Sequence, residues 1–260
     1  MLLTVDIGNS HTVLGVFRDG ELAQHFRLST DRSRTEDEYG VLIRALLSEH
    51  GIEWEQVDDA IVASVVPPLT ENWERLLARR LGRPPLVVGP GVKTGMAIRY
   101  ENPREVGADR IVNGVAGYER FREEEGGPHG VVVVDFGTAT TFDVISPKAE
   151  YLGGAIAPGV MISAEALFQR ASKLPRVDLT LPESPVGKNT VSSMQAGILY
   201  GYIGLVDGVL ARIRDSVGFS IKTVATGGVA RIIAEHANID AVDDELTLKG
   251  LRIIYGRNER

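Results

Sequence analysis

Two short segments of the chain combine an aspartate, a glycine and hydroxyl side chains in the same order. The first is Asp6-Ile7-Gly8-Asn9-Ser10-His11-Thr12 and the second is Asp135-Phe136-Gly137-Thr138-Ala139-Thr140-Thr141. Glycine lets the backbone come close to a ligand, and backbone N–H groups and hydroxyls can donate hydrogen bonds to phosphate oxygens. The aspartate can hold a cation beside them. Each segment therefore has the residue types of a phosphate-binding turn.

The two segments are copies of one pattern, separated by about half the chain. Asp6 aligns with Asp135, Gly8 with Gly137 and Thr12 with Thr141. A chance match is one explanation, but the same predicted order of strands and helices surrounds both copies. The repeat instead predicts two similar domains. If their turns face each other, a polyphosphate with a divalent metal suits the arrangement.

The elements that must position these turns can be assigned from hydrophobic periodicity. Runs such as Val131–Val134 are typical of strands buried on both faces, and apolar residues at helical spacing mark the helices. Strands are expected at 2–7, 13–17, 22–28, 60–66, 86–88, 131–136, 141–146, 151–157 and 221–225. Helices are expected at 35–50, 69–81, 105–123, 161–170, 191–217 and 246–255.

The order of elements, a three-stranded meander followed by helices alternating with parallel strands, resembles the ribonuclease-H-like unit. Because the pattern occurs twice, we expect an α/β fold of two tandem ribonuclease-H-like domains. The Gly-rich stretch 123–130 is the clearest linker, and the helix that precedes it could belong to either half. We place the domains at 1–115 and 116–260, with the cleft for the polyphosphate between them. The turn Ala225-Thr226-Gly227-Gly228 lies late in the chain between a strand and a helix.

Composition narrows the class of protein. The 260 residues are 43% hydrophobic and 24% charged, with a formal net charge of −7. This charge argues against a nucleic-acid or anionic-membrane surface, and the absence of cysteine excludes disulfides and thiol catalysis. The N-terminus lacks a signal peptide pattern, and no apolar run approaches the length needed to span a membrane. We expect a cytoplasmic protein with no nucleic-acid or membrane partner.

A further acid-containing segment is Gly107-Ala108-Asp109-Arg110, at the predicted start of a helix. Asp109 could act as a general base for an acceptor hydroxyl, or it could simply be an acid favoured by the helix dipole. Arg110 carries a planar guanidinium that can grip a carboxylate with two hydrogen bonds.

Two Asp-x-Gly hairpins in tandem domains resemble the superfamily of sugar and acetate kinases, actin and heat-shock ATPases. In that superfamily both hairpins hold the ATP phosphates, and a third glycine motif borders the adenosine. Within it the chain is similar to the type III pantothenate kinases. The motifs that carry the resemblance, in the family's order, are 6–10, 107–110, 135–141, 153–159 and 225–228. Ser10 departs from the family's usual threonine but keeps the hydroxyl.

The resemblance implies ATP-dependent phosphorylation of pantothenate to 4'-phosphopantothenate, the first step of coenzyme A biosynthesis, with Asp109 as general base. It implies Mg²⁺ near Asp6, bound through water, and a monovalent cation, potassium or ammonium, at Asp135. Implied ATP and phosphate contacts are Asp6, Gly8, Asn9, Ser10, Thr12, Gly137, Thr138, Thr140, Thr141, Gly227 and Gly228. Implied pantothenate contacts are Tyr100, Gly107, Ala108, Arg110 and, from the partner subunit of a homodimer, Thr190.

Other interpretations stay open at this point. A non-catalytic accessory or regulatory protein of the same fold is the main alternative, although Asp6, Asp109 and Asp135 are intact. A chaperone- or actin-like ATPase would need additional subdomains, and another small-molecule kinase would share the fold. The helix at 191–217 carries Gly197, Gly201 and Gly204, so it could pack against a second copy or within its own chain.

Overall fold

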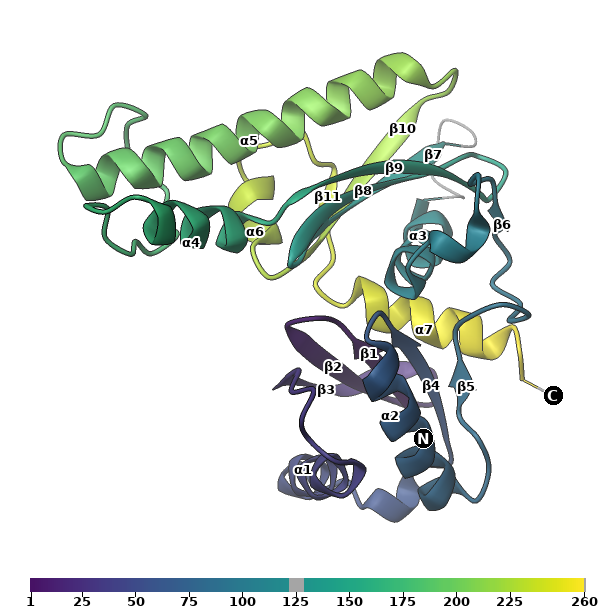
Figure 1. The fold of residues 1–260 in the computed structure, drawn as a ribbon. Helices are drawn as coiled ribbons and strands as arrows, with labels where there is room; N and C mark the ends of the chain where they lie inside the picture. The colour runs from purple at the N-terminus through teal and green to yellow at the C-terminus, as the bar shows by residue number, and fades with distance from the viewer. Residues whose placement is uncertain (122–128, 260) are drawn as a thin grey trace. The chain divides into compact units, whose positions relative to one another are not determined.

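The computed structural model describes residues 1–121 and 129–259 (Figure 1). The chain divides into two compact units, the first formed by Met1–Ala116 with Leu246–Arg260 and the second by Gly117–Glu245. Most of the linker expected at 123–130 lies outside the described residues, and the helix expected at 105–123 is described as α3 (Ala108–Phe121).

The first unit is built on a five-stranded sheet in the order β3-β2-β1-β4-β5. The first three strands form the predicted antiparallel meander, and β1 then pairs with β4 in parallel, as β4 does with β5. The strands are β1 (Leu2–Ile7), β2 (His11–Arg18), β3 (Glu21–Ser29), β4 (Asp59–Ser64) and β5 (Leu86–Val87).

Two helices cover one face of this sheet, α1 (Glu36–Glu49) and α2 (Pro67–Leu81). Thr35 begins α1 with a capping box, in which its hydroxyl accepts from the Glu38 amide and the Glu38 carboxylate accepts from the Thr35 amide. Alternate residues of β1 point into the core beneath these helices, so Asp6 points to the opposite face. The short elements of this unit are η1 (Trp54–Gln56), η2 (Pro103–Glu105) and β6 (Ala97–Ile98).

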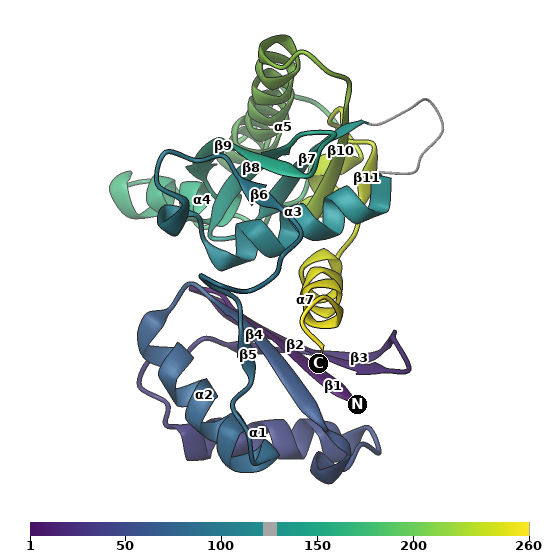
Figure 2. The same ribbon diagram turned by 90° about the vertical axis from the view of Figure 1, so that its right-hand side faces the viewer.

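The final helix, α7 (Leu246–Gly256), belongs to the first unit, whereas the sequence-based boundary at 115/116 assigns it to the second domain. It packs on β1, β2 and β4 (Figure 2). A methyl group on Gly15 would lie 3.0 Å from Leu248, and the Tyr255 hydroxyl donates to Asp59 over 2.7 Å. The sequence did not predict this placement, because α7 lies far along the chain from the strands on which it packs.

The second unit repeats the plan of the first. Its strands run in the order β11-β10-β7-β8-β9, with an antiparallel β7–β8–β9 meander and parallel pairing of β7 with β10. This repetition confirms the predicted α/β fold with two related units. The strands are β7 (Gly130–Phe136), β8 (Ala139–Ile145), β9 (Glu150–Pro158), β10 (Ile221–Gly227) and β11 (Ala241–Val242).

Three helices of this unit, α4 (Val160–Arg170), α5 (Thr190–Ser216) and α6 (Ala230–Ala234), lie on one side of its sheet (Figure 1). The valines of β7 that point to this side pack with Leu199, Val206 and Leu210 of α5. On the other side, Gly117 of α3 fits against Val131 and Val133.

The helix α5 bears on the expectation that no apolar run is long enough to span a membrane. By length and composition alone, Thr190–Ser216 qualifies as a candidate span, and a third of its most apolar window is buried. Glycine, serine and tyrosine interrupt the apolar residues, so the sequence shows no continuous apolar run although the mean hydropathy of the helix is high. The buried residues of α5 form part of the core of the second unit, which explains the apolar character of that face of the helix.

Candidate active site

The first Asp-x-Gly turn joins β1 to β2. The Gly8 amide donates to the His11 carbonyl over 3.0 Å, which closes the turn, and Asn9 and Ser10 are exposed at its tip. Asp6 is half-buried one residue before the end of β1, opposite Val13. The turn therefore presents backbone and polar side chains to solvent beside a carboxylate.

Thr30, which sequence reasoning missed, fixes the conformation of this turn. Its hydroxyl donates to the Gly8 carbonyl over 2.7 Å and lies 3.0 Å from the Thr12 hydroxyl, while its amide donates to the Ser10 carbonyl over 3.0 Å. Thr12 itself is fully buried. The Thr12 hydroxyl thus supports the turn from within, and the only sequence signal for Thr30 is its place at the end of β3.

Asp109 lies at the same end of the first sheet. A Cβ atom on Gly107 would come within 2.5 Å of Asp109 Oδ1 and 3.5 Å of the Val65 side chain. Val65 in turn donates its amide hydrogen to the Ile7 carbonyl at the end of β1, over 3.1 Å. Gly107 therefore lies beside Val65, which is bonded to the end of the strand that leads into the first turn.

The carboxylate of Asp109 is desolvated. Burial raises its pKa above the ordinary value, while the Arg110 amide, which donates to Oδ1 over 2.8 Å, and the Arg110 charge partly oppose the rise. Arg110 is itself buried. A carboxylate with a raised pKa in a partly enclosed place is typical of a general base.

The second turn joins β7 to β8. The Gly137 amide donates to the Ala139 carbonyl over 3.1 Å, Gly137 and Thr138 are exposed, and Asp135 is half-buried opposite Thr141. This turn therefore matches the first in the position of its aspartate and in having its glycine amide bonded to the returning strand, although the acceptor is two residues after the glycine here and three in the first turn.

The remaining hydroxyls of the second turn bind inside the unit. Thr140 is fully buried and shares a hydrogen bond of 2.6 Å with the Tyr202 hydroxyl of α5. Thr141 donates to Asp143 over 2.9 Å, and the buried Tyr151 hydroxyl donates to the same carboxylate over 2.7 Å. Because its hydrogen is directed at Asp143, the Thr141 oxygen presents lone pairs to other groups.

Two glycine motifs pack against the second turn. A Cβ atom on Gly159 would lie 2.5 Å from the Gly137 carbonyl oxygen. Gly227 has a φ of +96°, which favours glycine, and a Cβ atom there would lie 2.6 Å from the Phe136 carbonyl oxygen and 2.8 Å from Asp135 Oδ1. The Gly228 amide donates to the Phe136 carbonyl over 3.2 Å. The structure thus places the third glycine motif directly beside the second turn.

The other two candidates lie farther from the turns along the chain. Tyr100 is half-buried in the loop after β6, in the first unit, and Thr190 is the exposed first residue of α5, in the second. Ala108 begins α3 directly before Asp109.

The acids around the turns suit a hydrated metal better than a protein cage. Within residues 1–121 and 129–259, no group of three or more His, Asp or Glu residues could enclose a metal ion. Mg²⁺ commonly binds through one or two carboxylates, water and substrate phosphates. Asp6, beside a phosphate-binding turn, fits that mode of binding.

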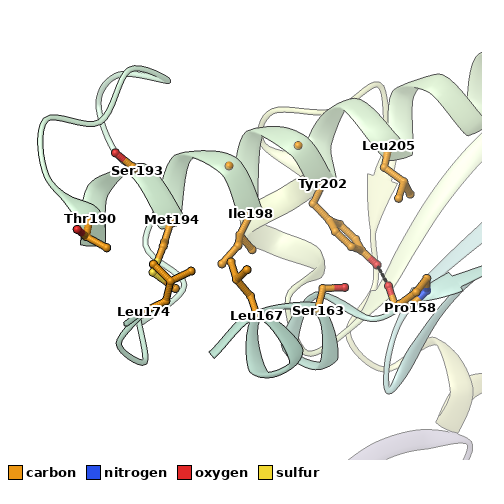
Figure 3. A pocket seen from close by; sticks show the side chains of 12 residues that line it. Pro158, Ser163, Leu167, Leu174, Thr190, Ser193, Met194, Ile198, Tyr202 and Leu205 are labelled. Atoms are coloured by element: carbon orange, nitrogen blue, oxygen red, sulfur yellow. Dashed lines mark hydrogen bonds between the residues drawn. The ribbon is translucent and has the colours of Figure 1, made fainter. Parts of the chain in front are cut away.

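A groove of about 760 Å³ lies between α4 and α5 (Figure 3). Its walls are largely apolar, with Leu167 of α4 facing Ile198 of α5 and Leu174 facing Met194, and Thr190 lies at one end. Tyr202 lies at the other end, where its hydroxyl bonds to the Pro158 carbonyl over 2.6 Å. The same hydroxyl contacts Thr140, so the groove wall and the second turn share a hydrogen-bonded residue.

Comparisons with known proteins identify the family of the chain. Residues 2–212 match the family described as type III pantothenate kinase. A type III pantothenate kinase from Myxococcus xanthus (strain DK1622) is 57% identical over 259 residues, which covers 99% of each chain.

Solved structures share the fold at low sequence identity. A protein described as a Baf family transcriptional activator, from Campylobacter jejuni, has a TM-score of 0.61 at 20% identity and covers 98% of both chains. An inorganic polyphosphate/ATP-glucomannokinase from Arthrobacter sp. strain KM has a TM-score of 0.51 at 15% identity and covers 99% of both. At these identities the likeness establishes the two-domain actin-like ATPase fold alone.

Proposed function

Since the chain belongs to the type III pantothenate kinase family, we propose that Asp109 is the general base of its reaction and that its two Asp-x-Gly turns hold the phosphates of ATP. The protein is a pantothenate kinase, which phosphorylates pantothenate in coenzyme A biosynthesis and uses ATP with a divalent metal. The observation that carries the assignment of the base is the contact of Asp109 with Gly107, at the same end of the sheet as the first turn.

Phosphoryl transfer requires mainly positioning and charge neutralisation, with a base to accept the hydroxyl proton. Asp109 has the enclosed position and the raised pKa for this role. It accepts the proton of the pantothenate hydroxyl as the hydroxyl oxygen attacks the terminal phosphorus of ATP, and the bond from that phosphorus to the bridging oxygen breaks to release ADP. Arg110 binds the pantothenate carboxylate, with Tyr100, Gly107 and Ala108 completing the substrate site.

The exposed tips of the turns contact the phosphates. Asn9 and Ser10 contribute from the first turn, with Gly8, and Gly137 and Thr138 contribute from the second. Thr12 and Thr140 act through the backbone conformation that their buried hydroxyls support. Asp6 holds Mg²⁺ through water, and Gly227 and Gly228 line the nucleotide beside the second turn.

A monovalent cation, potassium or ammonium, belongs at Asp135. The Thr141 oxygen, whose hydrogen is directed at Asp143, adds an acceptor on the strand directly opposite Asp135. Carboxylate and hydroxyl oxygens are suitable ligands for such a cation. We assign Thr141 to this site and not to direct donation to phosphate.

The active protein is a homodimer in which the groove between α4 and α5 belongs to the contact. A methyl group built on Gly197, Gly201 or Gly204 would meet no neighbouring element within 4 Å in the described part of the chain. The glycine face of α5, which could have packed within its own chain, is therefore open to a second copy. Exposed Met161 and Leu167 add apolar surface on α4. In this assembly Thr190 contacts pantothenate bound to the partner subunit, and the protein acts in the cytoplasm.

The cation site can be tested by following ADP release with ATP, Mg²⁺ and pantothenate in sodium or potassium salts. Potassium should stimulate the wild-type protein, and Asp135→Asn should require a higher potassium concentration. Equal rates in sodium and potassium would remove the cation from the mechanism.

The placement of Thr190 can be tested by mixing two impaired variants, Asp109→Asn and Thr190→Ala. A mixed dimer contains one site with both native residues, because each site takes Thr190 from the other subunit. Activity should therefore rise on mixing. An unchanged sum of the two separate activities, in a sample shown to contain mixed dimers, would place Thr190 in its own subunit's site or outside the site.

A further inference from the structure

The segment between β3 and α1, residues Thr30–Arg34, is attached to the first turn. Thr30 donates to the Gly8 carbonyl over 2.7 Å, and its amide donates to the Ser10 carbonyl over 3.0 Å. The next residue, Asp31, is held by the fully buried Tyr39, whose hydroxyl accepts from the Asp31 amide over 3.2 Å and donates to the Asp31 carbonyl over 3.0 Å.

The following turn is closed by the Asp31 side chain. Its carboxylate accepts from the Ser33 hydroxyl over 2.7 Å and from the Ser33 amide over 2.9 Å, and these hydrogen bonds lower its pKa. Arg32 lies between two residues that are fixed in this way. The bonds of the residues on both sides fix its backbone two residues after Thr30, which is itself bonded to the first turn. The starting point of the Arg32 side chain therefore has little freedom.

The guanidinium of Arg32 reaches the tip of the first turn. Its Nη2 donates to Asn9 Oδ1 over 3.0 Å, and both side chains are exposed. An exposed contact of this kind contributes little to folding stability. A guanidinium carries five N–H donors in a fork that matches phosphate oxygens. The bond to Asn9 uses one of them and orients the group, so other N–H donors can bind a phosphate.

The positive charge of Arg32 suits a role in binding phosphate. The turns that are assigned to the phosphates supply aspartates, and the chain has no Gly-rich loop with a phosphate-binding lysine. A nearby cation would offset the repulsion between these acids and a polyphosphate. The neighbouring Arg34 is stacked over the Tyr39 ring, with its guanidinium carbon 5.6 Å from the ring centroid, whereas Arg32 is directed at Asn9.

We propose that Arg32 binds the nucleotide phosphates held by the first turn, supplying the fixed positive charge that the turn itself lacks. The proposal rests on the assignment of Gly8–Ser10 to those phosphates. The bond between Arg32 and Asn9 also turns the Asn9 amide group, so that both side chains face the same ligand.

The test is to measure binding of ADP and of adenosine by titration calorimetry, and the KM values for ATP and pantothenate, in Arg32→Ala and Arg32→Lys. Loss of charge-assisted hydrogen bonds should weaken ADP binding and raise the KM for ATP about tenfold to hundredfold. The affinity for adenosine and the KM for pantothenate should change less than about twofold. Adenosine carries no phosphate, and the pantothenate site does not include Arg32. Lysine, which keeps the charge without the fork, should give an intermediate affinity for ADP.

The matched control is Arg44→Ala, which removes another exposed arginine that bonds to a side chain of the first unit, Glu55 over 3.3 Å. It should leave all four quantities unchanged. Ser10→Ala and Asn9→Ala separate the two assignments. If they weaken ADP binding and Arg32→Ala does not, the role of Arg32 is refuted while the turn keeps its function. If none of the three weakens ADP binding, both assignments fail, and equal losses for adenosine and ADP would also refute the role of Arg32.

Discussion

Gly107 lies so close to Asp109 that a Cβ atom built on it would be 2.5 Å from Asp109 Oδ1. No side chain fits there without moving that carboxylate, so the glycine is required by the conformation of the acid two residues later. The carboxylate turns back over Gly107 and accepts the Arg110 amide hydrogen. These contacts give a physical reason for the order Gly-Ala-Asp-Arg: the glycine leaves room for the Asp109 carboxylate, and the Arg110 amide holds that carboxylate in place.

Replacing Gly107 with alanine should displace Asp109 and lower kcat. A misplacement of about 1 Å can cost roughly a hundredfold in rate, so we expect a loss of that order with little change in Tm. Gly89→Ala is the control, since a Cβ atom at that exposed loop position meets nothing within 4 Å. A Gly107→Ala variant with wild-type kcat would show that the position of Asp109 is not critical.

Asp109→Asn should stabilise the protein at neutral pH. Because burial raises the pKa of Asp109 in the folded state, the folded protein binds this proton more tightly than the unfolded chain does. The contribution of Asp109 to stability is therefore greatest below its ordinary pKa of 3.8 and is lost as the pH rises through its folded-state pKa. Asparagine removes that cost.

Thermal unfolding of Asp109→Asn should accordingly show a higher Tm than wild type at pH 7 and a smaller difference in acid. The exposed Asp215→Asn variant serves as the control and should not show this pattern. A lower Tm for Asp109→Asn at pH 7 would mean that the ionised carboxylate contributes net stabilising contacts.

Asp143→Asn should weaken activation by potassium. The substitution removes the charge that takes the Thr141 hydrogen, so the Thr141 oxygen loses its fixed orientation opposite Asp135. The potassium concentration for half-maximal activity should rise several-fold. Tyr151→Phe is the matched control, because it removes a different hydrogen bond to Asp143 and leaves the one from Thr141. It should cost about 1 kcal/mol of stability and keep the potassium response, and a rise in both variants would indicate general loosening of the strand.

A large residue on the open face of α5 should prevent dimerisation. Gly201 is exposed and lines the groove, so Gly201→Arg fits the monomer and blocks a second copy. Light scattering should give the mass of one chain for this variant and of two for the wild type. Arg212→Ala, an exposed substitution farther along α5, should leave the dimer intact. A dimeric Gly201→Arg variant would place the interface elsewhere.

Local sequence patterns account for much of the site. The repeated Asp-x-Gly turns, the helix starting at Ala108 and the glycines at 227 and 228 were identifiable because their chemistry lies within a few residues of each other. The same holds for the strand order, which hydrophobic runs and turn residues specify.

The supporting residues could not be predicted in this way, because their contacts are set by register and packing. Thr30 reaches Gly8 through the pairing of β2 with β3, and Tyr202 reaches Thr140 from a helix that lies far along the chain. The return of α7 to the first sheet depends on a fit against Gly15 that neither segment shows alone.

The most direct test of the account is formation of phosphopantothenate by the wild type and by Asp109→Asn, with ADP and pantothenate binding measured on the same samples. We expect pantothenate-dependent product from the wild type, and a kcat lowered at least about a hundredfold in Asp109→Asn with both affinities retained. Wild-type kcat in Asp109→Asn would contradict the assignment of the base. ADP release by the wild type that does not depend on pantothenate would contradict the reaction itself.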